Sequence, residues 1–206
     1  MSAGTFEVDA EDDFDDTDDT VARLERPGAA APGAEPSLSY DLTVVTSDVS
    51  RVVAAAAGWL CDRVRAGWQV TVVVPPGEQR RALQIIGVGA ETVQSPSDAL
   101  RDRSGAAWAV DAAVLDSDVG VRREVQRALG RARTEVTVWG ASPWCSADRR
   151  FSPVRHQLSA AARAFKKHAL LSCGHPGPVS GAEDFRSAAL WYPIDGTDLV
   201  PISAPD

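Results

Sequence analysis

The sequence predicts an α/β domain with a mostly parallel, twisted sheet and helices on both faces. Short β-branched runs alternate along the chain with segments of helical periodicity. The runs are apolar throughout, which is typical of strands buried on both faces of a parallel sheet. Helix caps or turn formers follow the first two runs, at Ser47-Asp48 and at Pro75-Pro76-Gly77. Together these features predict three layers, with the sheet between two helical layers.

The first half of the predicted domain contains three strands. Residues 42–46 and 69–74 are β-branched runs, and a short third strand is expected over 91–94. Apolar residues recur at helical spacing over 49–64, and this helix is expected to end near Gly67. A second helix is expected over 78–86. The ligand-binding positions of such a sheet lie beyond the carboxyl ends of its strands.

The second half follows the same pattern. The expected elements are helices over 98–103 and 121–132, strands over 109–115 and 135–139, a helix from Pro153 to Phe165, a strand over 169–173, and an edge hairpin from 188–192 and 199–202. Pro153 is suited to the first turn of a helix because its amide needs no partner there.

The charge of the chain is concentrated at its start. The formal net charge is -8, yet residues 1–19 hold nine carboxylates and no Lys or Arg. We therefore expect a disordered acidic tail with a Pro, Gly and Ala-rich linker over 1–38, and one α/β domain over 39–206. Phe6 and Phe14 within the acidic run leave two roles open, a solubilising tail or a segment that docks on a basic groove.

Composition excludes several classes of protein. No apolar stretch approaches the roughly 20 residues of a membrane span, and the start lacks a signal peptide, so we expect a cytoplasmic protein. Three widely spaced cysteines argue against a disulfide framework. The spacing of the cysteines and histidines near the C-terminus also argues against structural zinc. They are Cys145, His156, His168, Cys173 and His175.

The turn after the first strand argues against nucleotide binding. Residues 46–51 contain neither the glycines nor the lysine of a phosphate loop, and Asp48 would repel phosphate. Asp48, Asp116 and Asp118 have two interpretations, a magnesium site at the sheet edge or three helix caps. We assign no catalytic residue, metal ligand or cofactor.

Basic side chains gather around two predicted helices. They would contact phosphate backbones or an acidic partner, or they are ordinary solvated helix faces. Trp144 lies in a polar loop and is a further contact candidate. The interaction candidates are Arg122, Arg123, Arg127, Arg131, Trp144, Arg149, Arg150, Arg155, Arg163, Lys166 and Lys167.

Part of the chain resembles the RecA-like recombinase core. Residues 69–74, 86–88 and 110–118 follow the order and spacing of that family, and Asp116 matches its Walker B acid as a degenerate position. The Walker A loop is missing. The chain is therefore similar to small RecA-like proteins without the ATPase, such as the SulA-like division inhibitors and the actinobacterial ImuA-type accessory factors of the DNA-damage response.

This resemblance implies a non-catalytic protein-interaction adaptor in DNA-damage tolerance or induced mutagenesis, within the SOS response and translesion synthesis. Its partner would be a polymerase-like or other repair protein, with nucleic acid as a further partner and no membrane. Two alternatives stay open. One is a small magnesium-dependent α/β enzyme that acts on a phosphorylated substrate through Asp48, Asp116 and Asp118. The other is an arginine-mediated nucleic-acid-binding module. Of these classes, an enzyme is the less favoured.

Overall fold

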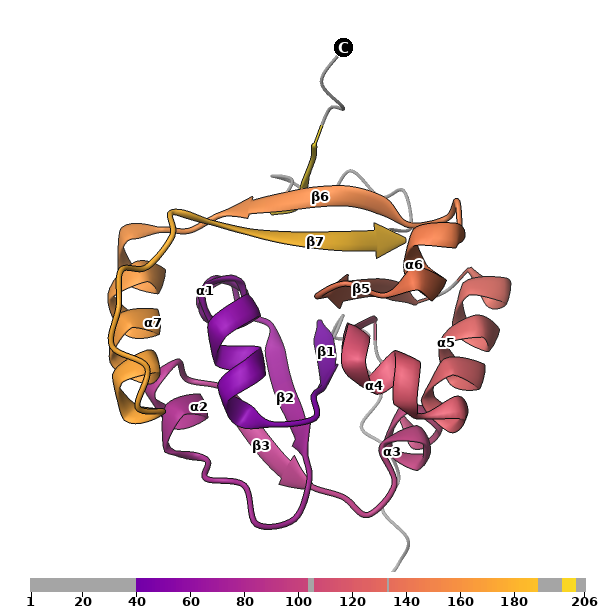
Figure 1. The fold of residues 1–206 in the computed structure, drawn as a ribbon, viewed down its shortest axis with the longest axis horizontal. Coiled ribbons are helices and arrows are strands. Elements are labelled where there is room, and N and C mark those ends of the chain that lie inside the picture. The colour runs from indigo at the N-terminus through magenta and orange to yellow at the C-terminus, as the bar shows by residue number, and fades with distance from the viewer. Residues whose placement is uncertain (1–39, 104–105, 133, 189–197, 203–206) are drawn as a thin grey trace, which may run out of the picture. The chain divides into compact units, whose positions relative to one another are not determined.

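The computed structural model describes residues 40–103, 106–132, 134–188 and 198–202 (Figure 1). The predicted tail and linker over 1–38 lie outside the described residues. The strands are β1 (Asp41–Val45), β2 (Gln69–Val74), β3 (Gly89–Thr92), β4 (Ala107–Asp111), β5 (Glu135–Trp139), β6 (Ser152–Gln157), β7 (Ala182–Ala188) and β8 (Val200–Pro201). The helices are α1 (Val49–Arg65), α2 (Arg81–Ile85), α3 (Pro96–Asp102), α4 (Ala112–Ser117), α5 (Val119–Arg131), α6 (Pro143–Ala147) and α7 (Ala160–Ser172).

The strands form one mixed sheet in the order β3-β2-β1-β4-β5-β7-β6-β8. The first five strands are parallel to one another, and Val45 of β1 pairs with Val73 on one side and Val110 on the other. β7 is antiparallel to β5 and β6, and β6 is antiparallel to β8. The structure thus confirms an α/β fold with a mostly parallel sheet. The order of the first five strands is that of doubly wound sheets.

Helices cover both faces of the parallel strands (Figure 1). α1, α2 and α7 lie on one face, and α3, α4, α5 and α6 lie on the other. Because side chains alternate along a strand, Val44 packs into the first layer and Val45 into the second. Trp59 and Leu60 are completely buried in the first layer, and Val121 and Val125 in the second. Within the described residues, none of the helices is long and apolar enough to cross a membrane.

One predicted strand is shorter than expected, and this changes the position of Asp116. The apolar run over 109–115 leaves the sheet at Asp111, whose carboxylate accepts a hydrogen bond from the Ala113 amide and caps α4. Residues 112–115 are therefore helical. Asp116 lies on α4, more than a turn beyond the end of the strand, and it does not occupy the strand-end position of a Walker B acid.

The C-terminal part differs more from the prediction. Pro153 lies in β6, where burial alternates between exposed and buried residues and places Val154 and His156 inward. α7 begins after Ser159, whose hydroxyl caps it, and it continues to Ser172. The predicted strand over 169–173 is therefore the end of a helix. The first arm of the expected hairpin, 188–192, lies outside the described residues except for Ala188; in its second arm, 199–202, Val200–Pro201 forms β8, which pairs with β6.

A buried ion pair joins α1, α7 and β7. The Glu183 carboxylate accepts hydrogen bonds from the Gly58 and Trp59 amides, at 2.9 and 2.8 Å, in the middle of α1. Lys166 donates to Glu183 at 2.5 Å and to the Ala54 carbonyl at 2.7 Å. That carbonyl is the one to which the Gly58 amide would donate in a regular α-helix. The antiparallel part of the sheet is thus attached to the interior of α1.

Candidate functional site

The candidate site lies where the order of the parallel strands reverses direction. β1 has β2 on one side and β4 on the other, and the helices that follow β1 and β4 lie on opposite faces of the sheet (Figure 1). In open α/β sheets, ligands bind outside the carboxyl ends of the strands at such a switch point. Here that edge is formed by the turn 46–48 after β1 and by Asp111 at the end of β4.

Asp111 is the central residue of this edge. Its side chain is completely buried, and its two carboxylate oxygens accept four hydrogen bonds. Arg51 on α1 donates from Nε at 2.7 Å and from Nη2 at 2.9 Å. The Ser47 hydroxyl donates at 3.0 Å, and the Ala113 amide at 2.9 Å. Asp111 thus ties the ends of two neighbouring strands and the starts of their helices together.

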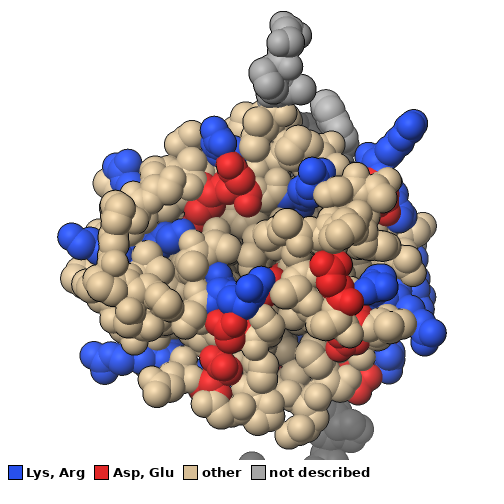
Figure 2. Space-filling view, viewed as in Figure 1, with Lys and Arg blue, Asp and Glu red and all other residues tan. Residues whose placement is uncertain are grey.

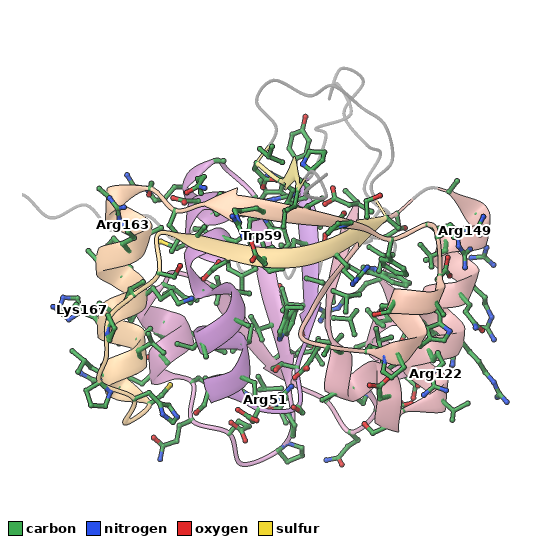
Figure 3. All side chains as sticks on the ribbon, turned by 45° about the horizontal axis from the view of Figure 1, so that its top comes forward. Arg51, Trp59, Arg122, Arg149, Arg163 and Lys167 are labelled. Carbon is green, nitrogen blue, oxygen red and sulfur yellow. The ribbon has the colours of Figure 1, made fainter. Side chains whose placement is uncertain are left out.

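The same contacts keep Asp111 ionised. Burial alone would raise the pKa of its carboxyl, but the hydrogen bonds from Arg51, Ala113 and Ser47 outweigh burial and hold that pKa below its usual value. In return, the hydrogen bond and charge of Asp111 raise the pKa of Arg51. Arg51 is 46% exposed, and Figure 3 shows it at the end of the parallel strands.

Two carboxylates accept hydrogen bonds from the amides of the first turn of α1. The Asp48 side chain accepts a hydrogen bond from the Arg51 amide at 2.8 Å. Glu78, from the loop after β2, accepts one from the Val49 amide at 3.1 Å. These amides are the groups that a phosphate would use at a helix N-terminus. The Asp48 and Glu78 carboxylates therefore occupy the place where a phosphate loop would bind the phosphates of its ligand.

The three aspartates considered for magnesium act as local hydrogen-bond acceptors. Asp48 caps α1, and Asp118 caps α5 by accepting from the Val121 amide at 3.0 Å. Asp116 accepts from the Ser142 hydroxyl at 2.7 Å, which links α4 to the loop after β5. In the described part of the chain, no three His, Cys, Asp or Glu residues are grouped so that they would hold a metal ion. The capping interpretation thus accounts for Asp48 and Asp118.

The predicted basic contacts divide into two groups. Three of the arginines form ion pairs with neighbouring acids, Arg127 with Glu124, Arg150 with Asp148, and Arg155 with Asp184. Arg122 donates to the carbonyls of Leu115 and Asp116 at the end of α4. The side chains that are exposed and have no partner among the described residues are Arg123, Arg131, Arg149, Arg163 and Lys167.

Two further candidates are less accessible than the sequence predicts. Lys166 was expected on a basic surface, but it is buried against Glu183 and is not available for contacts. The reason is that α7 turns this side chain toward α1, where it neutralises the glutamate. Trp144 is half-buried and packs edge-on against Phe151, with 5.9 Å between the ring centroids.

A second polar cluster joins Asp62, His156 and Ser159. The Ser159 hydroxyl donates to Asp62 at 2.6 Å, and His156 lies 3.0 Å from the other oxygen of that carboxylate. The serine hydroxyl donates to the aspartate, whereas a nucleophile would donate to its base. Burial would raise the pKa of Asp62, but these two contacts lower it overall. The cluster therefore anchors the end of α1 to β6 and α7.

The buried cysteines are not suited to nucleophilic chemistry. Burial raises the pKa of the Cys145 thiol to about 11 and also raises that of Cys61. A thiol nucleophile needs a lowered pKa because the thiolate is the reactive form.

Sequence patterns do not predict that Arg51, Glu78 and Asp111 belong to one cluster. The signal for Asp111 was present, because it is an acid within an otherwise apolar run. A buried carboxylate in such a run needs partners. Its partner Arg51 lies 60 residues earlier in the chain. Their pairing depends on β1 and β4 being neighbours, which local patterns do not reveal.

Comparisons with known proteins give only structural likeness. No protein-family model matches the chain, and no curated protein shows a significant match. Teicoplanin deacetylase Orf2, in its zinc-inhibited form, has a TM-score of 0.48 and 12% identity, over 71% of this chain and 97% of that one. The A40926 pseudoaglycone deacetylase Dbv21 has a TM-score of 0.47 and 13% identity, over 81% and 99%. The 4-carboxy-2-hydroxymuconate hydratase GalB from Pseudomonas putida has a TM-score of 0.44 and 11% identity, over 76% and 98%.

The resemblance to RecA-like proteins, which was based on the sequence, was wrong. The proteins of similar structure are deacetylases and a hydratase, and not RecA-like accessory factors of the ImuA or SulA type. The non-catalytic adaptor of DNA-damage tolerance, with its links to DNA repair, the SOS response and translesion synthesis, rested on the RecA-like resemblance and is wrong with it, since Asp116 lies on α4 and not at a strand end. At these identities and TM-scores, the likeness carries no argument about what this chain binds or converts.

Proposed function

We propose that this chain binds a small ligand that is rich in hydroxyl groups, and neutral or positively charged, at the switch point of its sheet. The observation that carries this proposal is the cluster around Asp111, which brings charged and hydroxyl side chains from two neighbouring strand ends to one place. In sheets of this order, that place is the usual binding crevice.

The charge of the site selects the class of ligand. Asp48, Glu78 and Asp116 lie on the same edge of the sheet as the Arg51–Asp111 pair, and Arg122 donates to the Asp116 carbonyl. These four carboxylates outnumber the two arginines. Asp48, Glu78 and Asp116 each use one oxygen for a hydrogen bond, and the second oxygen of each has no hydrogen-bond partner among the described residues. Free carboxylate oxygens accept from hydroxyl and ammonium donors and repel phosphate. A phosphorylated substrate is therefore disfavoured.

The hydroxyls of the site support recognition more than nucleophilic attack. The Ser47 hydroxyl faces Asp111, but both oxygens of that carboxylate already accept from Arg51. Asp111 is consequently a poor base for activating the serine. Ser47 is exposed and offers its lone pairs to a ligand hydroxyl, and Arg51 keeps Nη1 for a ligand oxygen.

The test is a thermal-shift comparison between matched ligands. Glucosamine should raise the Tm of the full chain, and glucosamine 6-phosphate, like ATP with magnesium, should raise it less, because phosphate meets the carboxylates of the site. The double variant Glu78→Gln/Asp116→Asn should lose the response to glucosamine. A control double variant, Asp102→Asn/Asp184→Asn, removes two exposed acids on α3 and β7 and should keep it. Stronger stabilisation by the phosphorylated ligands would contradict the proposal.

A further inference from the structure

α5 carries a row of arginines on its solvent side. Arg123, Arg127 and Arg131 are four residues apart and all exposed. On a helix this spacing places them along one stripe, about 6 Å apart along the axis. Arg127 pairs with Glu124, and the other two have no partner among the described residues. Glu124 is the only acid of the helix and is buried.

Two more arginines extend this surface. Arg149 and Arg150 are exposed in the segment between α6 and β6, and Arg149 has no partner among the described residues. Figure 3 places Arg149 on the flank of the domain that carries α5, and Figure 2 shows Lys and Arg side chains along that edge. We call these five residues the arginine flank: Arg123, Arg127, Arg131, Arg149 and Arg150.

The arginine flank lacks the features of a protein–protein interface. The large apolar side chains that are exposed in the described chain are Val119, Phe165, Leu171 and Val200. Phe165 and Leu171 lie on α7, and Figure 3 shows α7 on the opposite flank, marked by Arg163 and Lys167. Protein interfaces depend on buried aromatic and apolar anchors. Val119, the first residue of α5, is exposed beside Arg123, but one small aliphatic side chain is no such anchor. A row of arginines with so little apolar surface fits a polyanion that offers mainly charge.

We propose that the arginine flank binds the phosphate backbone of nucleic acid without reading its sequence. Arginine is the side chain best matched to phosphate, because its planar donors form paired hydrogen bonds with phosphate oxygens. The flank is separate from the acidic switch point, so this inference does not depend on the ligand proposed there. All five arginines would contact the phosphate backbone of the nucleic acid, and none would contact the edges of its bases.

The test measures binding of the full chain to a fluorescein-labelled duplex of random sequence at several salt concentrations. The flank variant Arg123→Gln/Arg131→Gln/Arg149→Gln removes three unpaired charges. The control variant Arg81→Gln/Arg163→Gln/Lys167→Gln removes three charges from α2 and α7, so both variants have the same net charge. A third variant, with lysine at the three flank positions, restores the charge. Unfolding midpoints of all variants are compared with the unaltered chain.

The wild type should bind at low salt, with an affinity that falls steeply as salt rises. The flank variant should reduce the slope of log K against log salt by about 2.7, since each lost phosphate contact removes about 0.9. The control and lysine variants should keep the slope. Absence of binding at low salt, or an equal loss of slope in the flank and control variants, would overturn the proposal. Equal binding of polyglutamate would also overturn it, because the surface would then fit acidic peptides.

Discussion

At the scale of single residues, Asp111 organises the candidate site. It is a completely buried carboxylate with four hydrogen-bond donors from both sides of the switch point. Its position could be suspected from the sequence, because an acid interrupts an apolar run there. Its partner could not, because Arg51 meets it only through the pairing of β1 with β4. Sequence patterns report burial, but they do not report which distant side chain satisfies a buried charge.

The Asp111→Asn variant should be less stable than the wild type by about 1–3 kcal/mol at neutral pH, because charge-assisted hydrogen bonds are lost. Arg51 is 46% exposed and regains water, which limits the loss. The pKa of Asp111 lies below its usual value in the fold, so its ionised form stabilises the native state above the ordinary aspartate pKa of about 3.9. This contribution is lost as the pH falls through the native pKa. Urea unfolding of the wild type and of Asp111→Asn between pH 3 and 7 measures this contribution.

The difference in unfolding free energy between Asp111→Asn and the wild type should therefore shrink below about pH 4. Asp184→Asn is the control. Asp184 also forms an arginine pair, but its side chain is 57% exposed, so its loss should change the stability by less than about 1 kcal/mol. Equal stability of Asp111→Asn and the wild type at pH 7 would refute the role given to Asp111.

At the scale of elements, local patterns predicted the first half of the domain and failed later. Residues 49–64 and 69–74 became α1 and β2 because their periodicity and caps agree with their burial. Pro153 was misleading because it occupies a strand, where Ser152–Gln157 pairs with β7 and β8. Residues 169–173 look β-like in isolation, but the helix capped at Ser159 continues to Ser172. At Pro153, strand pairing overrides a local preference, whereas at 169–173 the helix continues past the point where the local pattern suggests an end.

Two helical glycines make a direct test of packing at this scale. A Cβ on Gly58 of α1 would overlap the Leu158 side chain and lie 3.2 Å from the Glu183 carboxylate. Gly58→Ala should therefore destabilise the fold by about 1–3 kcal/mol. Gly130 of α5 has open space around its Cβ position. Gly130→Ala should stabilise the fold by about 0.5–1 kcal/mol, because alanine is the better helix former.

Thermal or urea unfolding of these two variants measures both effects in one experiment. The changes in unfolding free energy of the two variants should have opposite signs. This outcome distinguishes packing from helix propensity, since propensity alone would make both variants more stable. A stabilised Gly58→Ala would mean that Leu158 and the Glu183 contact to α1 are not packed as described.

At the scale of the whole molecule, the alternation of strands and helices predicted the α/β class and its two helical layers. It did not predict the order of the strands, which places β1 between β2 and β4. That order decides which loops meet, and therefore where the site lies. The RecA-like resemblance relied on motif order along the chain, and it failed because Asp116 lies on α4 and not at a strand end.

Ligand binding at the carboxyl edge of the parallel strands is the central claim. Backbone amide NMR spectra, recorded while glucosamine is added to the full chain, test this most directly. We predict that shift changes concentrate in residues 46–51, 77–78, 111–118 and 140–142, which follow four neighbouring strands. Glucosamine 6-phosphate should produce smaller changes at the same amides. Changes confined to other parts of the fold, or larger changes with the phosphorylated sugar, would contradict the account.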